Sequence, residues 1–471
     1  MEKKDTNKTL IIVIIALAAI FCCLLVSCCA FTFYAASRMD SKEMSRIIND
    51  SLPSGSPFVS GSETAQTASE TLDFTDIDES ELNGLSPEEY EIIQVTEQTR
   101  GLTVETKMAP IYQTVDELRQ DLMDDLAEVT DEEFAEELGM YTVLGFAPEG
   151  FDLRQFYVDM YSEQIAGFYD PEDNTMHLIG EDSPYENAMT LSHEYTHYLQ
   201  YNQPEFSDTL KYDDDFCEEN GETCLIIDAL VEGDAVLTET LTDAASLLEG
   251  YEEDTGSTAE SSVFDSAPKF FQDSLLFPYS YGFDFVFYQY MKGGFDAVNE
   301  LYIKLPQSIE QIMHPEKYLK DLPVHVNVDP YRAVIEKNGK LIREDVMNES
   351  DVMMLLSSGY NKDWQLSERQ ASTGAEGWGG GTYLFGTYED KPLFFTKLVW
   401  DTEEDAKEAE TVFSIYSDKR FGQKLENNSW KDANGTEVRL IRQRDVLYYM
   451  ILPEGFNSRD LLDLIENRSI I

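Results

Sequence analysis

The chain has 471 residues, of which 42% are hydrophobic and 12% aromatic, which is enough apolar material for two packed domains. Its 91 acidic residues outnumber 34 basic ones, so the formal net charge is −57 at pH 7. This charge argues against nucleic acid and anionic lipid headgroups as partners, because both are themselves negatively charged.

Residues 10–36 form an almost uninterrupted apolar run, preceded by Lys3, Lys4 and Lys8. The run is longer than the roughly 20 residues that span a bilayer, and a positively charged flank stays on the inner side. We therefore expect residues 1–37 to be a single-pass anchor in the cell membrane, a transmembrane helix that leaves the rest of the chain extracellular. The alternative is a lipoprotein lipidated at Cys28, because Leu25-Val-Ser-Cys28 fits the small-residue pattern that precedes such a cysteine.

Residues 38–88 are acidic and rich in Ser and Thr, a composition that cannot bury enough apolar surface to fold. We expect a disordered, flexible stalk there. The composition becomes more apolar near residue 90. Residues 91–96 predict a strand, and residues 115–138 predict a helix.

Residues 165–169 and 175–179 flank Asp170-Pro-Glu-Asp-Asn174, and this turn composition predicts a β-hairpin. His177 lies on the second strand. We interpret it as an ordinary strand residue, because no other residue stands at metal-ligand spacing from it.

The segment that follows, Leu191–Gln200, contains the pattern His-Glu-x-x-His as His193, Glu194 and His197. Ser183-Pro-Tyr-Glu186 has the residues that start a helix, and on a helix two residues four apart share one face. Two imidazoles so placed can hold a zinc ion (Zn2+), and Glu194 can accept a proton from water beside it. The alternative is an amphipathic helix with two solvated histidines.

A zinc site needs a third protein ligand, and we expect it on the helix predicted for residues 224–248. Glu232 stands there among apolar residues, where a carboxylate needs a neutralising partner such as a metal ion. The alternative is a solvated glutamate. Cys217 and Cys224 are the only cysteines beyond the expected anchor, and we expect them to form a disulfide. Free thiols or a zinc-binding pair are the alternatives.

His193-Glu-x-x-His197 followed by Glu232-Gly-x-Ala resembles the gluzincin zinc metallopeptidases of the peptidase MA-like clan. Residues 92–318 are also similar to uncharacterised bacterial surface proteins with the same order of motifs. The resemblance implies an α+β catalytic domain in residues 89–330, with a zinc helix, a glutamate helix and an edge-strand sheet that receives the substrate backbone. The hairpin is the candidate for that edge. The aminopeptidase segment Gly-x-Met-Glu-Asn is missing, which favours an endopeptidase.

Pro278-Tyr-Ser-Tyr-Gly282 resembles the segment in which the aminopeptidase N branch of this clan carries its catalytic tyrosine. The resemblance places that role, a donor to the oxyanion, on Tyr279. Tyr281 and His314 are the other candidates for this donor, and all three side chains could instead be structural.

Residues 331–471 are expected to form a small α+β domain. Strands are predicted at 382–387, 393–400, 437–441 and 446–452, and helices at 403–417 and near 458. In the preceding domain, 251–269 is predicted to be a surface loop and 283–305 a helix. The glycine-rich stretch 377–381 lacks the ending of a phosphate-binding loop and is expected to be a tight turn.

Together these patterns predict a membrane-anchored, extracytoplasmic zinc metalloendopeptidase that acts on peptides or proteins. Its metal ligands would be His193, His197 and Glu232, and its catalytic residues Glu194 and Tyr279, with His314 in reserve. Two alternatives remain at this point. One is a catalytically silent surface binding protein on the same fold, and the other is a zinc hydrolase of a non-peptide substrate.

Overall fold

The structure is a computed structural model and describes residues 82–180, 188–210, 214–248, 262–422, 424–425 and 428–468. The expected anchor at residues 1–37, the alternative lipidation site Cys28, nearly all of the expected stalk and the helix start at 183–186 lie outside the described residues. Within the described ranges, no helix is both long and apolar enough to cross a bilayer.

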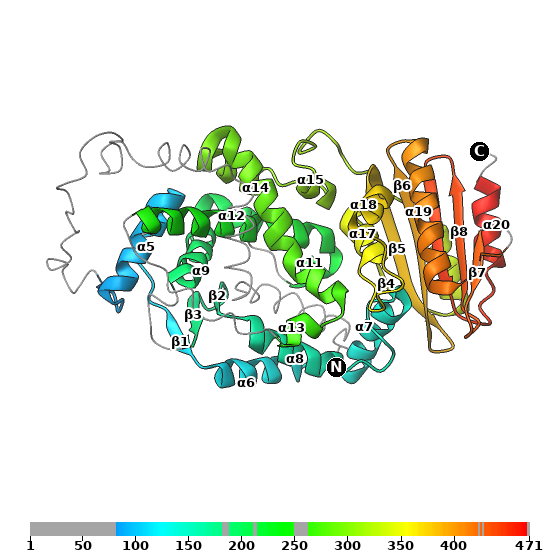
Figure 1. Ribbon diagram of the computed structural model, residues 1–471, viewed down its shortest axis with the longest axis horizontal. Coiled ribbons are helices and arrows are strands. Elements are labelled where there is room, and N and C mark those ends of the chain that lie inside the picture. Colours follow the sequence, from blue (N-terminus) through cyan, green and yellow to red (C-terminus); the bar gives the residue numbers. More distant parts are fainter. Residues whose placement is uncertain are drawn as a thin grey trace, which may run out of the picture.

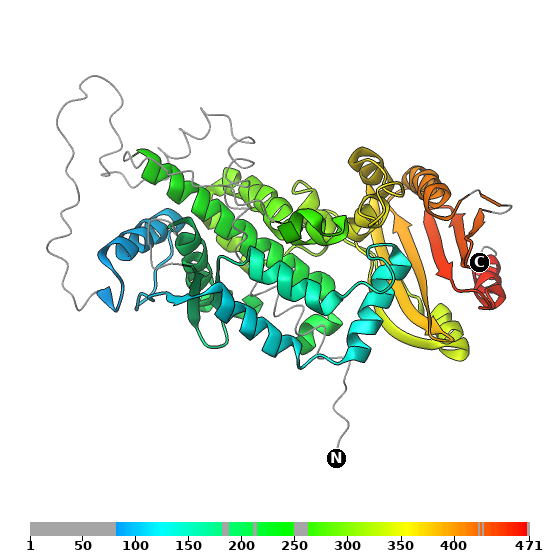
Figure 2. The ribbon, with the colours of Figure 1, turned by 60° about the horizontal axis from the view of Figure 1, so that its bottom comes forward.

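Two units lie side by side along the long axis of the molecule (Figure 1). The first is mainly helical and carries a small sheet, and the second is built around a larger sheet with helices packed on it. The view in Figure 2 shows the same division. The protein therefore has the mixed α+β character that was expected.

The prediction of a strand at residues 91–96 is wrong, because these residues belong to helix α5, Pro87–Arg100. Ser86 caps this helix by accepting a hydrogen bond from the backbone of Glu89, whose side chain accepts one from the backbone of Ser86. Pro87 occupies the first helical position, and Gly101 ends the helix in the left-handed conformation. These end signals outweigh the strand preference of the β-branched residues between them.

The helix expected at 115–138 is two helices, α6 (Val115–Leu126) and α7 (Asp131–Leu144). Thr130 starts the second one with a capping box to Glu133. Helix α8, Leu153–Gln164, then returns along α6.

The first unit has one small sheet of three strands, β1 (Ile111–Gln113), β2 (Gly167–Asp170) and β3 (Thr175–Ile179). Strand β3 is central, antiparallel to β2 and parallel to β1. The predicted hairpin is thus confirmed. Its turn is closed by Asp170, whose carboxylate accepts the backbone N–H of Glu172, and by Asn174 at φ 53°.

Three helices form the centre of the first unit: α9 (Ala188–Tyr201), α12 (Gly221–Leu248) and α14 (Lys269–Ile303). Helix α14 begins well before the expected residue 283, so Tyr279 and Tyr281 are helical residues. The shorter elements are η2 (Pro204–Phe206), α10 (Ser207–Leu210), α11 (Asp214–Glu219), α13 (Ser262–Ser266) and α15 (Ile309–Met313).

Helices α12 and α14 touch at two glycines. A Cβ atom on Gly233 would lie 2.3 Å from the carbonyl group of Gly282, and one on Gly282 would lie 2.1 Å from the carbonyl oxygen of Ala229. No side chain fits at either position. The glycine that follows Glu232 and the glycine three residues after Tyr279 therefore bring their two helices into backbone contact.

The second unit contains a six-stranded antiparallel sheet in the order β4-β5-β6-β9-β8-β7. Its strands are β4 (Lys340–Val346), β5 (Trp378–Tyr388), β6 (Lys391–Trp400), β7 (Ser429–Lys431), β8 (Glu437–Gln443) and β9 (Val446–Leu452). Its helices are α16 (Asp329–Asn338), α17 (Glu349–Ser357), α18 (Glu368–Ala375), α19 (Glu403–Phe421) and α20 (Arg459–Arg468). The four predicted strands and both predicted helices are confirmed.

The tight turn expected at 377–381 is wrong, because Trp378 opens strand β5 and the following glycines continue it. Glycine is needed at two of these positions because backbone atoms of other segments lie close to them. A Cβ atom on Gly380 would lie 2.4 Å from the carbonyl oxygen of Val324, and one on Gly381 would lie 2.3 Å from that of Met347. The glycine run therefore serves close packing on a strand.

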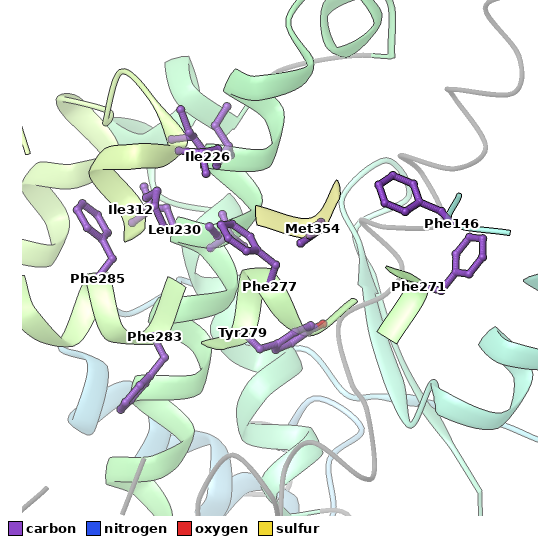
Figure 3. Close-up of a cluster of buried hydrophobic side chains, with 14 of the residues drawn as sticks. Phe146, Ile226, Leu230, Phe271, Phe277, Tyr279, Phe283, Phe285, Ile312 and Met354 are labelled. Atoms are coloured by element: carbon purple, nitrogen blue, oxygen red, sulfur yellow. The ribbon is translucent and has the colours of Figure 1, made fainter. Parts of the chain in front are cut away.

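A continuous buried apolar cluster contains residues of both units. Figure 3 shows part of it, with Leu230 of α12, Phe277 of α14 and Met354 of α17 among the side chains drawn. Polar contacts also cross between the units, for example the ion pair of Glu137 on α7 with Arg343 on β4 at 3.1 Å. A second cluster packs α16 and α20 on the sheet.

Candidate metal centre

Helix α9 is buried on all sides. From Thr190 to Gln200 every residue is buried, including Glu194, His193 and His197. A helix so enclosed must find a partner for each polar side chain, because an unpaired buried polar group is costly. The partners of the two histidines define the candidate site.

The two imidazoles and one carboxylate converge on one point. The Nε2 atom of His193 lies 3.2 Å from Oε2 of Glu232, and that of His197 lies 3.8 Å from the same oxygen. His193 and His197 come from successive turns of α9, and Glu232 comes from the facing helix α12. The structure therefore brings together the three ligands that were predicted from the sequence.

The spacing of these three atoms fits a tetrahedral metal ion. Zinc binds nitrogen and oxygen at about 2.0–2.1 Å, so two of its tetrahedral ligands lie roughly 3.3 Å apart. The two measured separations, 3.2 and 3.8 Å, bracket that value. Two imidazoles with one carboxylate are also a donor set that zinc accepts.

Each imidazole is held from behind by a second residue. Nδ1 of His193 lies 2.9 Å from Oε2 of Glu239, and Nδ1 of His197 lies 2.9 Å from Oε1 of Gln200. Such acceptors fix a proton on Nδ1 and leave the Nε2 lone pair for a metal ion. Both rings are therefore oriented as metal ligands require.

Glu239 and Gln200 were not among the predicted site residues. Glu239 follows Glu232 by seven positions, two helical turns along the same face of α12. Gln200 follows His197 by three positions, which again is the same face. Helical spacing from the predicted ligands is the sequence signal that could have found them.

The two histidines have opposite electrostatic surroundings. Burial lowers the pKa of His193, but hydrogen bonds to Glu232 and Glu239 outweigh it and leave the pKa well above its ordinary value. Burial lowers the pKa of His197 to about 4, with the Glu232 carboxylate opposing this shift. His197 is thus neutral, whereas the two buried carboxylates beside His193 favour either its protonated form or a bound cation.

Of the three candidate oxyanion donors, Tyr279 has its ring beside that of His193. Its ring centroid is 6.3 Å from that of His193, and its side chain is buried. The Tyr281 hydroxyl points to the sulfur of Met353, and its ring stacks on Phe277.

His314 follows the short helix α15, and its Nε2 atom lies 2.9 Å from the Glu349 carboxylate, which raises the pKa of the imidazole. His177 stacks on Phe168 in the hairpin, with ring centroids 4.4 Å apart. The described residues include two groups of potential metal ligands, His193–His197–Glu232 and Glu310–Asp321–Asp401, and neither group contains His314 or His177.

The comparisons with known proteins concern the second unit. A family model described as "Domain of unknown function (DUF8575)" matches residues 335–454, from the last turn of α16 to just beyond β9. No curated protein and no solved structure matches the chain. His193, His197 and Glu232 lie outside the matched segment, so the interpretation of this group depends on the geometry of the first unit.

Proposed function

We propose that this chain is a membrane-anchored, extracytoplasmic zinc metalloendopeptidase. The observation that carries the proposal is the convergence of His193, His197 and Glu232 within metal-binding distance of one another. The acceptors behind both imidazoles support it, because metal-binding histidines almost always have such partners.

The chemistry divides among a few side chains. Zinc held by the three ligands would act as a Lewis acid and make bound water acidic near neutral pH. Glu194 follows the first ligand on α9 and would accept the proton of the attacking water, then pass it to the leaving amine. Tyr279 would donate its hydroxyl proton in a hydrogen bond to the carbonyl oxygen that becomes negative.

The sheet offers a place for an extended peptide. Among the described strands, β2 pairs only with β3, so its other edge is the position at which a substrate strand would be added. This strand lies close against the zinc helix, because a Cβ atom on Gly167 would be 2.8 Å from the methyl group of Thr190 on α9. A substrate paired with β2 would thus run beside α9. The missing Gly-x-Met-Glu-Asn segment supports cleavage within a peptide rather than at its N-terminus.

Location outside the cytoplasm is part of the proposal. It is supported by the apolar run at residues 10–36 and by the disulfide between the buried Cys217 and Cys224, a bond typical of oxidising compartments. Protease added to intact cells should release a fragment that begins between residues 38 and 88. Complete protection of the chain in intact cells, with cleavage after lysis, would contradict this location.

The decisive test of the activity uses the full-length protein, loaded with zinc, on a broad peptide library. Wild type should cut internal bonds. Glu194→Gln keeps the size of the side chain but cannot accept the proton, so it should retain zinc while hydrolysis falls by about 100-fold or more. Removal of single N-terminal residues would contradict the endopeptidase assignment. No cleavage by zinc-loaded wild type would favour a silent binding protein or a hydrolase of another substrate.

A further inference from the structure

A buried ion pair lies behind the metal centre, at residues that the proposed mechanism does not use. Arg100 of α5 and Asp234 of α12 are both fully buried. Nη2 of Arg100 donates to Oδ2 of Asp234 at 2.9 Å, and its Nε atom is 2.7 Å from Oδ1. A buried ion pair is costly to form unless further hydrogen bonds satisfy it, so the other partners of this pair are informative.

Gln200 connects this ion pair to a metal ligand. Its Nε2 atom donates to Oδ2 of Asp234 at 3.1 Å and to the carbonyl oxygen of Val231 at 3.0 Å. Its Oε1 atom lies 2.9 Å from Nδ1 of His197. The chain Arg100–Asp234–Gln200–His197 therefore runs from the α5 helix to the metal site through direct hydrogen bonds.

The two ends of the Gln200 amide are chemically different, and this difference sets the donor-to-acceptor direction of the hydrogen bonds on either side of Gln200. An Asp carboxylate and a backbone carbonyl only accept hydrogen bonds, so the donating NH2 group must face Asp234 and Val231. The amide oxygen must then face His197. An acceptor at that place keeps the proton on Nδ1 of His197 and leaves its Nε2 lone pair directed toward Glu232.

Helix α14 also holds Asp234 and Arg100 in place. The Tyr302 hydroxyl donates to Oδ2 of Asp234 at 2.8 Å, and Nη2 of Arg100 donates to the side-chain oxygen of Asn299 at 2.8 Å. Four helices, α5, α9, α12 and α14, thus contribute to one buried network. A network of this kind transmits a precise orientation because each member has a fixed partner.

We propose that Asp234, held by Arg100, and Gln200 are positioning residues of the metal centre, which fix the tautomer and orientation of His197 and thereby set metal affinity. The proposal rests on the metal site of the proposed function. It extends that site to residues that would not touch the ion. It also gives helix α5, far from α9 in sequence, a part in the chemistry.

The test measures the zinc affinity of the full-length protein by competition with a chelator. Gln200→Met removes the amide oxygen and the NH2 group but keeps a side chain of similar length. Zinc binding should weaken about 10- to 100-fold, the usual cost of losing such a partner. Thr238→Val is the matched control. Thr238 is fully buried on α12, and its hydroxyl has no hydrogen-bond partner among the described residues. This control should bind zinc as wild type does.

A second substitution separates positioning from general damage. Asp234→Asn should weaken zinc binding alone but add little in the Gln200→Met background, because it acts through Gln200. If the losses of zinc affinity in the two single variants add up in the double variant, Asp234 does not act through Gln200. Where Asp234→Asn does not fold, Gln200→Met decides: a folded variant whose zinc affinity stays within about twofold of wild type overturns the proposal. Wild type that binds no zinc would instead overturn the proposed function itself.

Discussion

The Nε2 atom of His193 lies 3.2 Å from Oε2 of Glu232, although 39 positions separate the two residues in the chain. Their meeting depends on how α12 is seated between α9 and α14. Helix α12 presents Glu232 to α9, and its next residue, Gly233, lies against the backbone of Gly282 on α14. The geometry of the proposed metal site thus depends on a helix contact that only glycine permits.

Gly233→Ala should therefore damage both stability and metal binding. The added methyl would lie 2.3 Å from backbone atoms of Gly282, which cannot move aside as a flexible side chain can. We expect a loss of about 3 kcal/mol or more in the free energy of unfolding and weaker zinc binding. Thermal unfolding and chelator competition measure the two effects.

Gly139→Ala is the control for this change, because its methyl would meet Phe385 at an ordinary 3.5 Å. This second variant should be tolerated. Equal behaviour of the two variants would contradict the role of the α12–α14 contact.

Tyr279→Phe should lower kcat by about 100-fold while zinc stays bound, since it removes a hydroxyl that acts in the transition state. The Tyr279 ring lies 6.3 Å from the His193 ring between centroids. Tyr281→Phe on the same helix is the control, and its hydroxyl lies 3.8 Å from the sulfur of Met353. A loss of activity in Tyr281→Phe instead would transfer the role to that residue.

Stability should depend on pH through Glu222 at the start of α12. Burial, together with nearby Asp351 and Asp345, raises the pKa of its carboxyl to about 8, while its hydrogen bond from the Ile309 backbone opposes the shift. The folded protein thus binds a proton that the unfolded chain releases near pH 4.5. The contribution to stability is complete below that pH and is lost as pH rises through 8.

Glu222→Gln keeps an acceptor for the Ile309 N–H but cannot ionise. Its melting temperature should match that of wild type near pH 5 and exceed it by a few degrees above pH 8. Melting curves of the two proteins across this range provide the measurement. A difference that does not change with pH would show that Glu222 does not titrate in this window.

Local patterns predicted the parts of the site that depend on spacing along one element. His193, Glu194 and His197 are set by the helical repeat, and the hairpin is set by its turn residues. Glu232 could be predicted because a carboxylate in an apolar helix needs a partner. The rest of the site depends on which helices meet. Nothing near Arg100 in the sequence points to Asp234, 134 positions away, because tertiary packing alone makes that contact.

Two errors in the predicted elements have different origins. Residues 91–96 have strand-forming side chains, but a capping box at one end and Gly101 at the other fix a helix. The glycines at 379–381 were expected to turn the chain, whereas they let neighbouring backbone approach a strand. In the first case the residues that cap the helix decide the outcome, and in the second case tertiary backbone contacts do.

Zinc content tests the central claim most directly. Elemental analysis of the purified full-length protein should find about one zinc per chain, as three protein ligands and one water require. His193→Ala, His197→Ala and Glu232→Ala should each lose it, while Glu194→Gln, which removes no ligand, should keep it. Full zinc occupancy in the three ligand variants, or none in wild type, would contradict the metal site on which the proposed function rests.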